Sequence, residues 1–175
     1  ENAPEAAIAG GEDNTADTIL VKVPHKVTKP DFVTGETVVA PGGDYTFGYA
    51  DTENYTYSNL KVTVGGTEVT PTENDDGTYT ITNIDGEVVI TVTQTANSYD
   101  VTFEPVDSVT YDGADKATYG TDYTVTVTTS KTGHKIGTVT AKIGDETVTL
   151  TSGENNQYVL DGGKIKAAVE ITATV

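Results

Sequence analysis

The chain has 175 residues with 27 acidic and 10 basic side chains, no cysteine and a net charge of −17. The absence of cysteine excludes disulfides, thiol catalysis and thiolate metal sites. The negative charge repels phosphate backbones and anionic membranes, so we expect neither a nucleic-acid partner nor membrane insertion. Hydrophobic residues are scarce at 35%, while the recurring Val, Thr and Tyr favour strands. We therefore predict an all-β protein.

Residues 1–17 combine Ala, Gly, Pro and acids with almost no large apolar side chain. Such a composition cannot offset the entropy of ordering, and it predicts an acidic disordered linker. The chain begins at Glu1 without an initiator methionine, so we interpret it as a piece of a longer protein with no signal peptide or membrane span inside it.

A first β repeat is predicted over residues 18–94. Strict alternation begins at Thr18 and places Ile19, Val21 and Val23 on one face of a predicted first strand. An alternating run with Tyr45, Phe47 and Tyr49 predicts a strand whose aromatic side chains face the core. Leu60, Val62 and Val64 before the turn Gly65–Gly66 predict a tight hairpin. Val88, Ile90 and Val92 predict the last strand of the repeat.

The same pattern returns over residues 98–175. Tyr123 lies 78 residues after Tyr45, and the drift of this spacing up to 81 residues is what insertions in loops produce. Matching the two copies pairs Ile19, Val21 and Val23 with Tyr99, Val101 and Phe103, and the first hairpin with Val139, Ala141 and Ile143 before the turn Gly144–Asp145. We predict a duplication in which both copies have one topology.

Only the six residues "TQTANS" separate Val92 from Tyr99. A connection this short, without glycine or proline, leaves little slack between two pinned strands. We therefore expect a stiff, extended pair of modules.

The second copy carries the segments "VTF" (101–103), "YGTDYTVTV" (119–127), "TGHKIGTVTAKIG" (132–144), "YVLDGG" (158–163) and "VEITATV" (169–175). In these segments the chain resembles the tandem repeats of Gram-positive cell-surface proteins, in the bacterial immunoglobulin-like and divergent internalin B-repeat groups. The resemblance implies small all-β modules in stalks or adhesive arrays. About seven strands and no helix per copy favour two immunoglobulin-like β-sandwich modules, with β-grasp-like repeats as the alternative.

The sequence gives little support for a catalytic site built around a histidine. His25 and His134 are the two histidines, and they occupy non-equivalent places in the two repeats. A Ser/His/Asp arrangement needs a histidine held between a carboxylate and a nucleophile. We expect both histidines to be solvated loop or strand-end residues and the protein not to be an enzyme.

Calcium is a candidate ligand, because clustered side-chain oxygens on a loop suit a hard cation. The richest clusters are "NDDG", with Asp75 and Asp76, and "DGAD", with Asp112 and Asp115. Neither has the spacing of an EF-hand loop. Turn chemistry accounts for Asn, Asp and Gly equally well, so no cofactor is required.

Carbohydrate binding is the alternative from another functional class. All-β modules bind polysaccharides by stacking exposed aromatic rings on sugar faces, and Tyr55, Tyr111 and Tyr119 are the candidate residues. Tyr57 matches Ile136 in the repeat alignment, which predicts a core position for it instead.

The expected function is a non-catalytic extracellular stalk, spacer or adhesion module of a larger bacterial surface protein, attached to the cell through other parts of that protein. Expected partners are neighbouring modules of the same chain and a host or cell-surface protein or polysaccharide. The alternative is a carbohydrate-binding module for starch or another polysaccharide.

Overall fold

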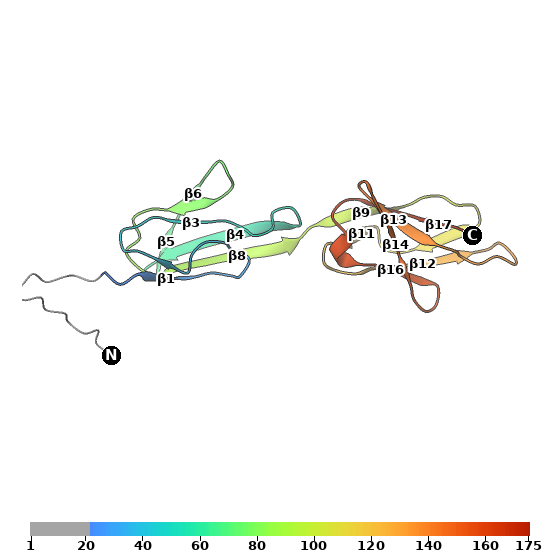
Figure 1. Cartoon of the computed structure of the whole chain (residues 1–175), viewed down its shortest axis with the longest axis horizontal. Coiled ribbons are helices and arrows are strands. Elements are labelled where there is room, and N and C mark those ends of the chain that lie inside the picture. Colours follow the sequence, from blue (N-terminus) through green and yellow to red (C-terminus); the bar gives the residue numbers. More distant parts are fainter. Residues whose placement is uncertain (1–21) are drawn as a thin grey trace, which may run out of the picture. The chain divides into compact units, whose positions relative to one another are not determined.

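A computed structural model describes residues 22–175 of the chain. The predicted acidic linker, residues 1–17, and the predicted strand residues Ile19 and Val21 lie outside this range. The all-β prediction is confirmed, since the described residues form strands and one short 3-10 turn. Figure 1 shows these strands as arrows, coloured along the sequence from blue near the N-terminus to red at the C-terminus.

The first eight strands are β1 (His25–Thr28), β2 (Val38–Val39), β3 (Tyr45–Phe47), β4 (Tyr55–Val64), β5 (Thr67–Val69), β6 (Thr72–Glu73), β7 (Tyr79–Ile81) and β8 (Val88–Ala96). The next elements are β9 (Ser98–Phe103), β10 (Val109–Asp112), β11 (Lys116–Thr118), β12 (Tyr123–Thr129), β13 (Val139–Ile143), β14 (Glu146–Thr149), β15 (Thr151–Ser152), β16 (Gln157–Leu160), the 3-10 turn η1 (Gly162–Lys164) and β17 (Val169–Ala173).

The chain divides into two compact units. The described part of the first unit consists of residues 22–50 and 60–91, and the second unit consists of residues 51–59 and 92–175. The start of β4 and the end of β8 thus belong to the second unit. The predicted module boundaries, 18–94 and 98–175, stay a prediction.

Strand order supports the predicted duplication. One sheet has the order β2-β1-β8-β4-β5, and a sheet of the second copy has the matching order β11-β9-β17-β13-β14. The remaining strands also match, since β3-β7-β6 corresponds to β12-β16-β15, to which β10 is added. Even the register is repeated, because Tyr45 pairs with Ile81 and Tyr123 pairs with Leu160.

The first and last strands of each copy pair in parallel. Val27 of β1 lies opposite Val88 of β8, and Val101 of β9 lies opposite Val169 of β17. Immunoglobulin sandwiches consist of antiparallel sheets with a different strand order, so the predicted immunoglobulin-like arrangement is not confirmed. The parallel pairing makes each five-stranded sheet a mixed sheet, and the β-grasp-like alternative stays a prediction.

Each copy buries part of the alternating apolar set that the sequence predicts; in the first copy Tyr45, Phe47, Val62, Val88 and Ile90 are buried, whereas Tyr49, Leu60, Val64 and Val92 are half-buried. In the second copy, one continuous core joins β9, β13 and β17 of the five-stranded sheet with β12 and β16 of the other sheet. Tyr123, Val125 and Val127 all point into this core, and Tyr45 and Phe47 are buried in the first copy. Two sheets that share one core make a β-sandwich-like layer arrangement.

The predicted first strand of the first repeat is misplaced. Val23 is 73% exposed and lies before β1, whereas Val27 is buried and pairs with Val88. Val27, rather than Val21, is therefore the counterpart of Val101. Alternation alone identified a strand-like segment, but the strand that joins the sheet is defined by a partner about 60 residues further along the chain.

A buried tyrosine closes the same loop in both copies. The Tyr45 hydroxyl donates to the Glu36 carbonyl at 2.8 Å, and the Tyr123 hydroxyl donates to the Ala114 carbonyl at 2.6 Å. In both cases the acceptor lies nine residues before the tyrosine. Each ring thus joins a core strand to the loop that precedes it, and the repeated bond supports the duplication.

These tyrosines predict a loss of stability in alkali. Burial raises the pKa of Tyr45 and of Tyr123, and the nearby carboxylates of Glu36 and Asp115 raise them further. Because the native state favours the neutral phenol, this stability is present below about pH 10, the ordinary tyrosine value, and is lost as the pH rises through the raised pKa. We expect tyrosinate absorbance from these rings to appear together with unfolding measured by circular dichroism.

A Tyr45→Phe/Tyr123→Phe variant provides the control. It loses two hydrogen bonds worth about 1 kcal/mol each at neutral pH but should lose less further stability between pH 9 and 11 than the unmodified chain. Ionisation of all ten tyrosines near pH 10, the ordinary tyrosine pKa, while circular dichroism still shows intact sheets would contradict the prediction.

Candidate functional site

Two of the three candidate sugar-binding tyrosines meet in the second unit. The rings of Tyr55 on β4 and Tyr119 after β11 have centroids 5.4 Å apart and planes 90° apart. Both residues are half-buried. A sugar stacks on an open ring face, and two rings in edge-to-face contact present no common plane for it. The pair is better suited to packing than to a platform.

Tyr111 lies apart from that pair, on β10. Its ring stacks on Phe103, with centroids 5.2 Å apart and planes at 12°. The Tyr111 hydroxyl is buried beside Thr172 and Ala173, and burial raises its pKa. Since one ring face is covered by Phe103, Tyr111 contributes to packing between β9 and β10. The structure therefore does not bring the three predicted residues into one site.

A cluster of side-chain amides beside Tyr55 escaped the sequence prediction. Asn97 accepts a bond from the Thr56 hydroxyl at 2.7 Å and donates to the Glu53 carbonyl at 2.8 Å. Its backbone N–H donates to the Asn54 carbonyl at 2.9 Å, and its carbonyl accepts from Tyr119 N–H at 2.9 Å. Asn97, the residue between β8 and β9, is thus fixed at four points.

Asn54 and Asp51 form the base of this cluster. Asn54 is a buried polar residue, and its side-chain amide contacts both carboxylate oxygens of Asp51, at 2.9 and 3.2 Å. The hydrogen bonds from Asn54 lower the pKa of Asp51. An Asp that accepts from the backbone two and three residues later is a turn signature, and "DTEN" would have revealed it in the sequence. The arrangement fixes a loop and leaves no carboxylate oxygen unpaired.

The predicted calcium clusters form turns. Asp76 accepts from the backbone N–H of Thr78 at 3.0 Å and from its hydroxyl at 2.6 Å, and these bonds lower the pKa of Asp76. Asp75, Asp112 and Asp115 are exposed. Across residues 22–175 no three Asp, Glu or His side chains gather as a metal site would require.

Neither histidine lies in a catalytic arrangement. His134 is exposed, and its Nδ1 lies 3.1 Å from the Thr132 carbonyl. His25 is half-buried on β1, at the position that Tyr99 occupies in the second copy, and no hydrogen bond of its Nε2 is seen within the described residues. A general base needs the proton that it abstracts within hydrogen-bond reach. The non-enzymatic expectation stays a prediction.

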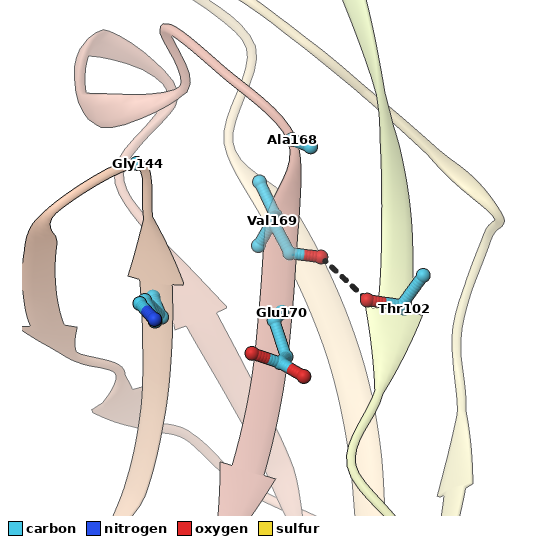
Figure 2. A pocket seen from close by; sticks show the side chains of 6 residues that line it. Thr102, Gly144, Ala168, Val169 and Glu170 are labelled. Atoms are coloured by element: carbon cyan, nitrogen blue, oxygen red, sulfur yellow. Dashed lines mark hydrogen bonds between the residues drawn. The ribbon is translucent and has the colours of Figure 1, made fainter.

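The second unit has a shallow hollow of about 250 Å³ on the outer face of its five-stranded sheet. Figure 2 shows Thr102 of β9 beside Val169 and Glu170 of β17, with the Thr102 hydroxyl donating to the Val169 carbonyl at 3.4 Å. Lys142 of β13 also lines the hollow. Open to solvent and lined by residues of adjacent strands, it is the surface of a sheet rather than an enclosed ligand site.

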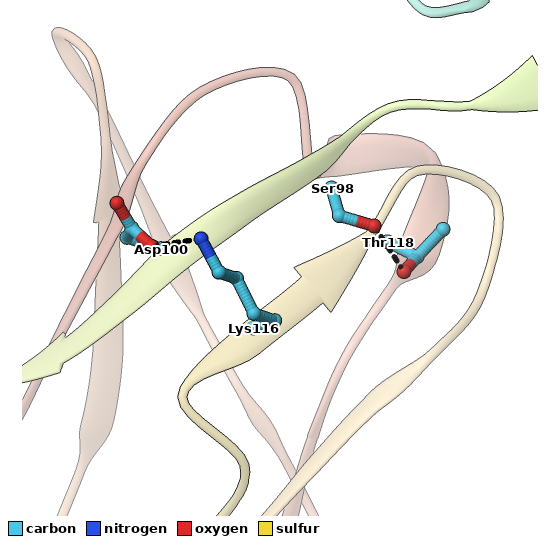
Figure 3. A network of polar contacts seen from close by, with 4 residues as sticks. All are labelled: Ser98, Asp100, Lys116 and Thr118. Atoms are coloured by element: carbon cyan, nitrogen blue, oxygen red, sulfur yellow. Dashed lines mark hydrogen bonds and ion pairs between the residues drawn. The ribbon is translucent and has the colours of Figure 1, made fainter.

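Polar pairs cross the neighbouring strands β9 and β11 on the same unit. Lys116 forms an ion pair with Asp100, and the hydroxyls of Ser98 and Thr118 lie 2.8 Å apart (Figure 3). Both pairs are directly opposite in the antiparallel register. Opposite-charge and hydroxyl pairs that lie directly across two strands stabilise a sheet modestly. They account for these side chains without any ligand.

No protein-family model, curated protein or solved structure matches the chain. Among the described residues, no helix has the length and apolar character needed to span a membrane.

Proposed function

We propose that the chain is a non-catalytic, tension-bearing spacer within a larger extracellular bacterial surface protein. The resemblance to tandem surface repeats supports the location and the attachment to a cell through other parts of the protein. The repeated strand order supports a role that depends on the fold itself rather than on one set of side chains. A spacer transmits force between its two ends.

The parallel pairing of first and last strands carries this proposal. Tension enters each copy at the start of its first strand and leaves at the end of its last strand. Because these strands are parallel neighbours, the two forces slide one strand along the other. Shear loads every hydrogen bond of the pair together, whereas tension on an antiparallel pair would break its bonds one at a time.

The experiment compares two directions of pulling on the full chain. In the shear geometry, the handles are attached at Ser98, where β9 begins, and at Val175, just after β17 ends. In the peeling geometry, they are attached through Ser98→Cys and Ala168→Cys. These two residues lie at the same end of the parallel strands, so the force separates β9 from β17 from that end. The chain has no cysteine of its own, so the engineered thiols define the attachment. We expect the force that first disrupts the pair to be several-fold higher in shear. Equal forces in the two directions would contradict the spacer.

Adhesion to a host or cell-surface protein or a polysaccharide is compatible with the same architecture, with the partner bound by other surfaces. The carbohydrate-binding alternative depends on Tyr55, Tyr111 and Tyr119. The perpendicular contact of Tyr55 with Tyr119, and the stacking of Tyr111 on Phe103, favour the spacer over that alternative.

A further inference from the structure

The two copies hold their first and last strands together with unequal strength. We call β1 with β8, and β9 with β17, the terminal strand pairs. The terminal pair of the first unit has two residue pairs in register, Val27 with Val88 and Thr28 with Val89. The terminal pair of the second unit has three, Val101 with Val169, Thr102 with Glu170 and Phe103 with Ile171.

Additional bonds lengthen the terminal pair of the second unit. The backbone N–H of Glu104 donates to the Ile171 carbonyl at 2.8 Å, beyond the last register pair. The Thr102 hydroxyl adds a contact to the Val169 carbonyl, drawn in Figure 2. In the first unit the Thr28 hydroxyl contacts the exposed Glu87 carboxylate at 3.2 Å. A bond to a solvated side chain adds little, because water competes for both groups.

The end of the first strand is also anchored differently in the two copies. Phe103, at the end of β9, stacks on Tyr111 of β10, which joins the strand to the second sheet. The counterpart of Phe103 is Lys29, whose ammonium bonds to the Val33 carbonyl. An aromatic pair contributes about 0.5–1.5 kcal/mol beyond its buried area, and Lys29 supplies no such contact. Sliding β9 therefore requires loss of a ring stack that β1 lacks.

Resting on the proposed spacer function, we infer that the first unit yields first under tension and that the second unit remains folded until a higher force. The chain then lengthens in two separate steps. Because the number of bonds sheared together sets the resisting force, the shorter terminal pair is the one that slides at lower load. Unfolding of the first unit then lengthens the chain at moderate tension, while the second unit stays folded.

Matched disulfide locks identify which unit each step belongs to. Thr28→Cys/Val89→Cys locks the first terminal pair, and Thr102→Cys/Glu170→Cys locks the equivalent positions of the second. Adjacent strands lie about 4.8 Å apart, within the Cα separation of disulfides. With no native cysteine present, no other bridge can form within the chain. Each lock removes at most about 210 to 240 Å of extension from its copy of the repeat, at about 3.5 Å per residue.

The full chain is stretched by its two ends in a single-molecule instrument, oxidised and then reduced. We expect the first lock to shorten the low-force step and the second lock to shorten the high-force step, with both effects reversed by reduction. The inference would be overturned if the second lock shortened the low-force step, or if each lock shortened both steps equally. Loss of resistance in shear relative to peeling would instead overturn the spacer, whichever unit opened first.

A variant without a disulfide tests the same inference. Phe103→Ala removes the ring stack on Tyr111 and leaves the strand register in place. We expect it to lower the force of the second step towards that of the first. Lys29→Ala is the matched change in the first unit, and it should shift the first step less. An unchanged gap between the steps in Phe103→Ala would count against the anchoring role of the ring.

Discussion

Gly162→Ala is expected to destabilise the second unit by about 3 kcal/mol or more. A Cβ added at Gly162 would lie 2.4 Å from the backbone N and C of Thr121. Two backbone segments cross there, held by the Gly120 N–H donating to the Gly162 carbonyl and by the Gly162 N–H donating to the Asp122 carboxylate, both at 2.9 Å. Neither segment has a flexible side-chain end that could move aside, so the methyl group must separate the backbones and break both bonds.

Thermal unfolding followed by circular dichroism measures this effect. For a unit of this size, a loss of about 3 kcal/mol lowers the melting temperature by on the order of 15 °C. Gly163→Ala is the control, because its added Cβ would meet only the Asp161 side chain, at 3.2 Å. We expect the control to melt close to the unmodified chain. Equal melting temperatures for Gly162→Ala and the unmodified chain would show that the crossing is looser than described.

Ile171→Ala is expected to cost about 2–5 kcal/mol, the range for truncation of a fully buried aliphatic side chain. Ile171 is 0% exposed and lies in the middle of β17, between Ala141 of β13 and Phe103 of β9. Because its neighbours belong to strands on both sides, the cavity cannot close by the shift of one loop. Denaturant unfolding should show a lower midpoint for the second unit at unchanged slope.

Ile90→Ala makes the equivalent change in the first unit, where Ile90 is 1% exposed. Thr124→Ala, on the exposed face of β12, is the surface control and should change stability by less than about 0.5 kcal/mol. If Ile171→Ala unfolded no earlier than Thr124→Ala, β17 could not be a central strand of a packed sheet.

Local pattern predicted the elements whose partners lie close in sequence. The hairpins β4–β5 and β13–β14 turn at Gly65–Gly66 and Gly144–Asp145, as the turn residues indicate. Glycine suits these turns because Gly65 and Gly144 have φ near +55°, a left-handed conformation that most residues with a Cβ avoid. Alternation likewise identified the buried faces of β3 and β12, since side chains two residues apart lie on one face of any strand.

Nonlocal pairing was beyond the sequence pattern. Nothing in the alternation of Ile19, Val21 and Val23 distinguishes them from Val27, and only Val88 reveals which segment enters the sheet. For the same reason the pattern favoured an immunoglobulin-like arrangement, although the parallel terminal pairs follow another order. The candidate tyrosines posed a related problem: Tyr111 was predicted as a sugar-binding residue, whereas its place on β10 depends on pairing with Val127 and its ring stacks on Phe103.

The parallel terminal pairs also determine when each copy can fold. Val101 and Val169 become neighbours only after the whole intervening chain has been made, because β17 completes the centre of the sheet last. Contacts between residues so distant in sequence slow folding, since loop closure must precede the contacts that stabilise it. Each copy therefore lacks the central strand of its five-stranded sheet until its own last strand, β8 or β17, has been synthesised. Such late folding would keep the polypeptide in an unfolded form suited to passage through an export channel, in agreement with the proposed extracellular location.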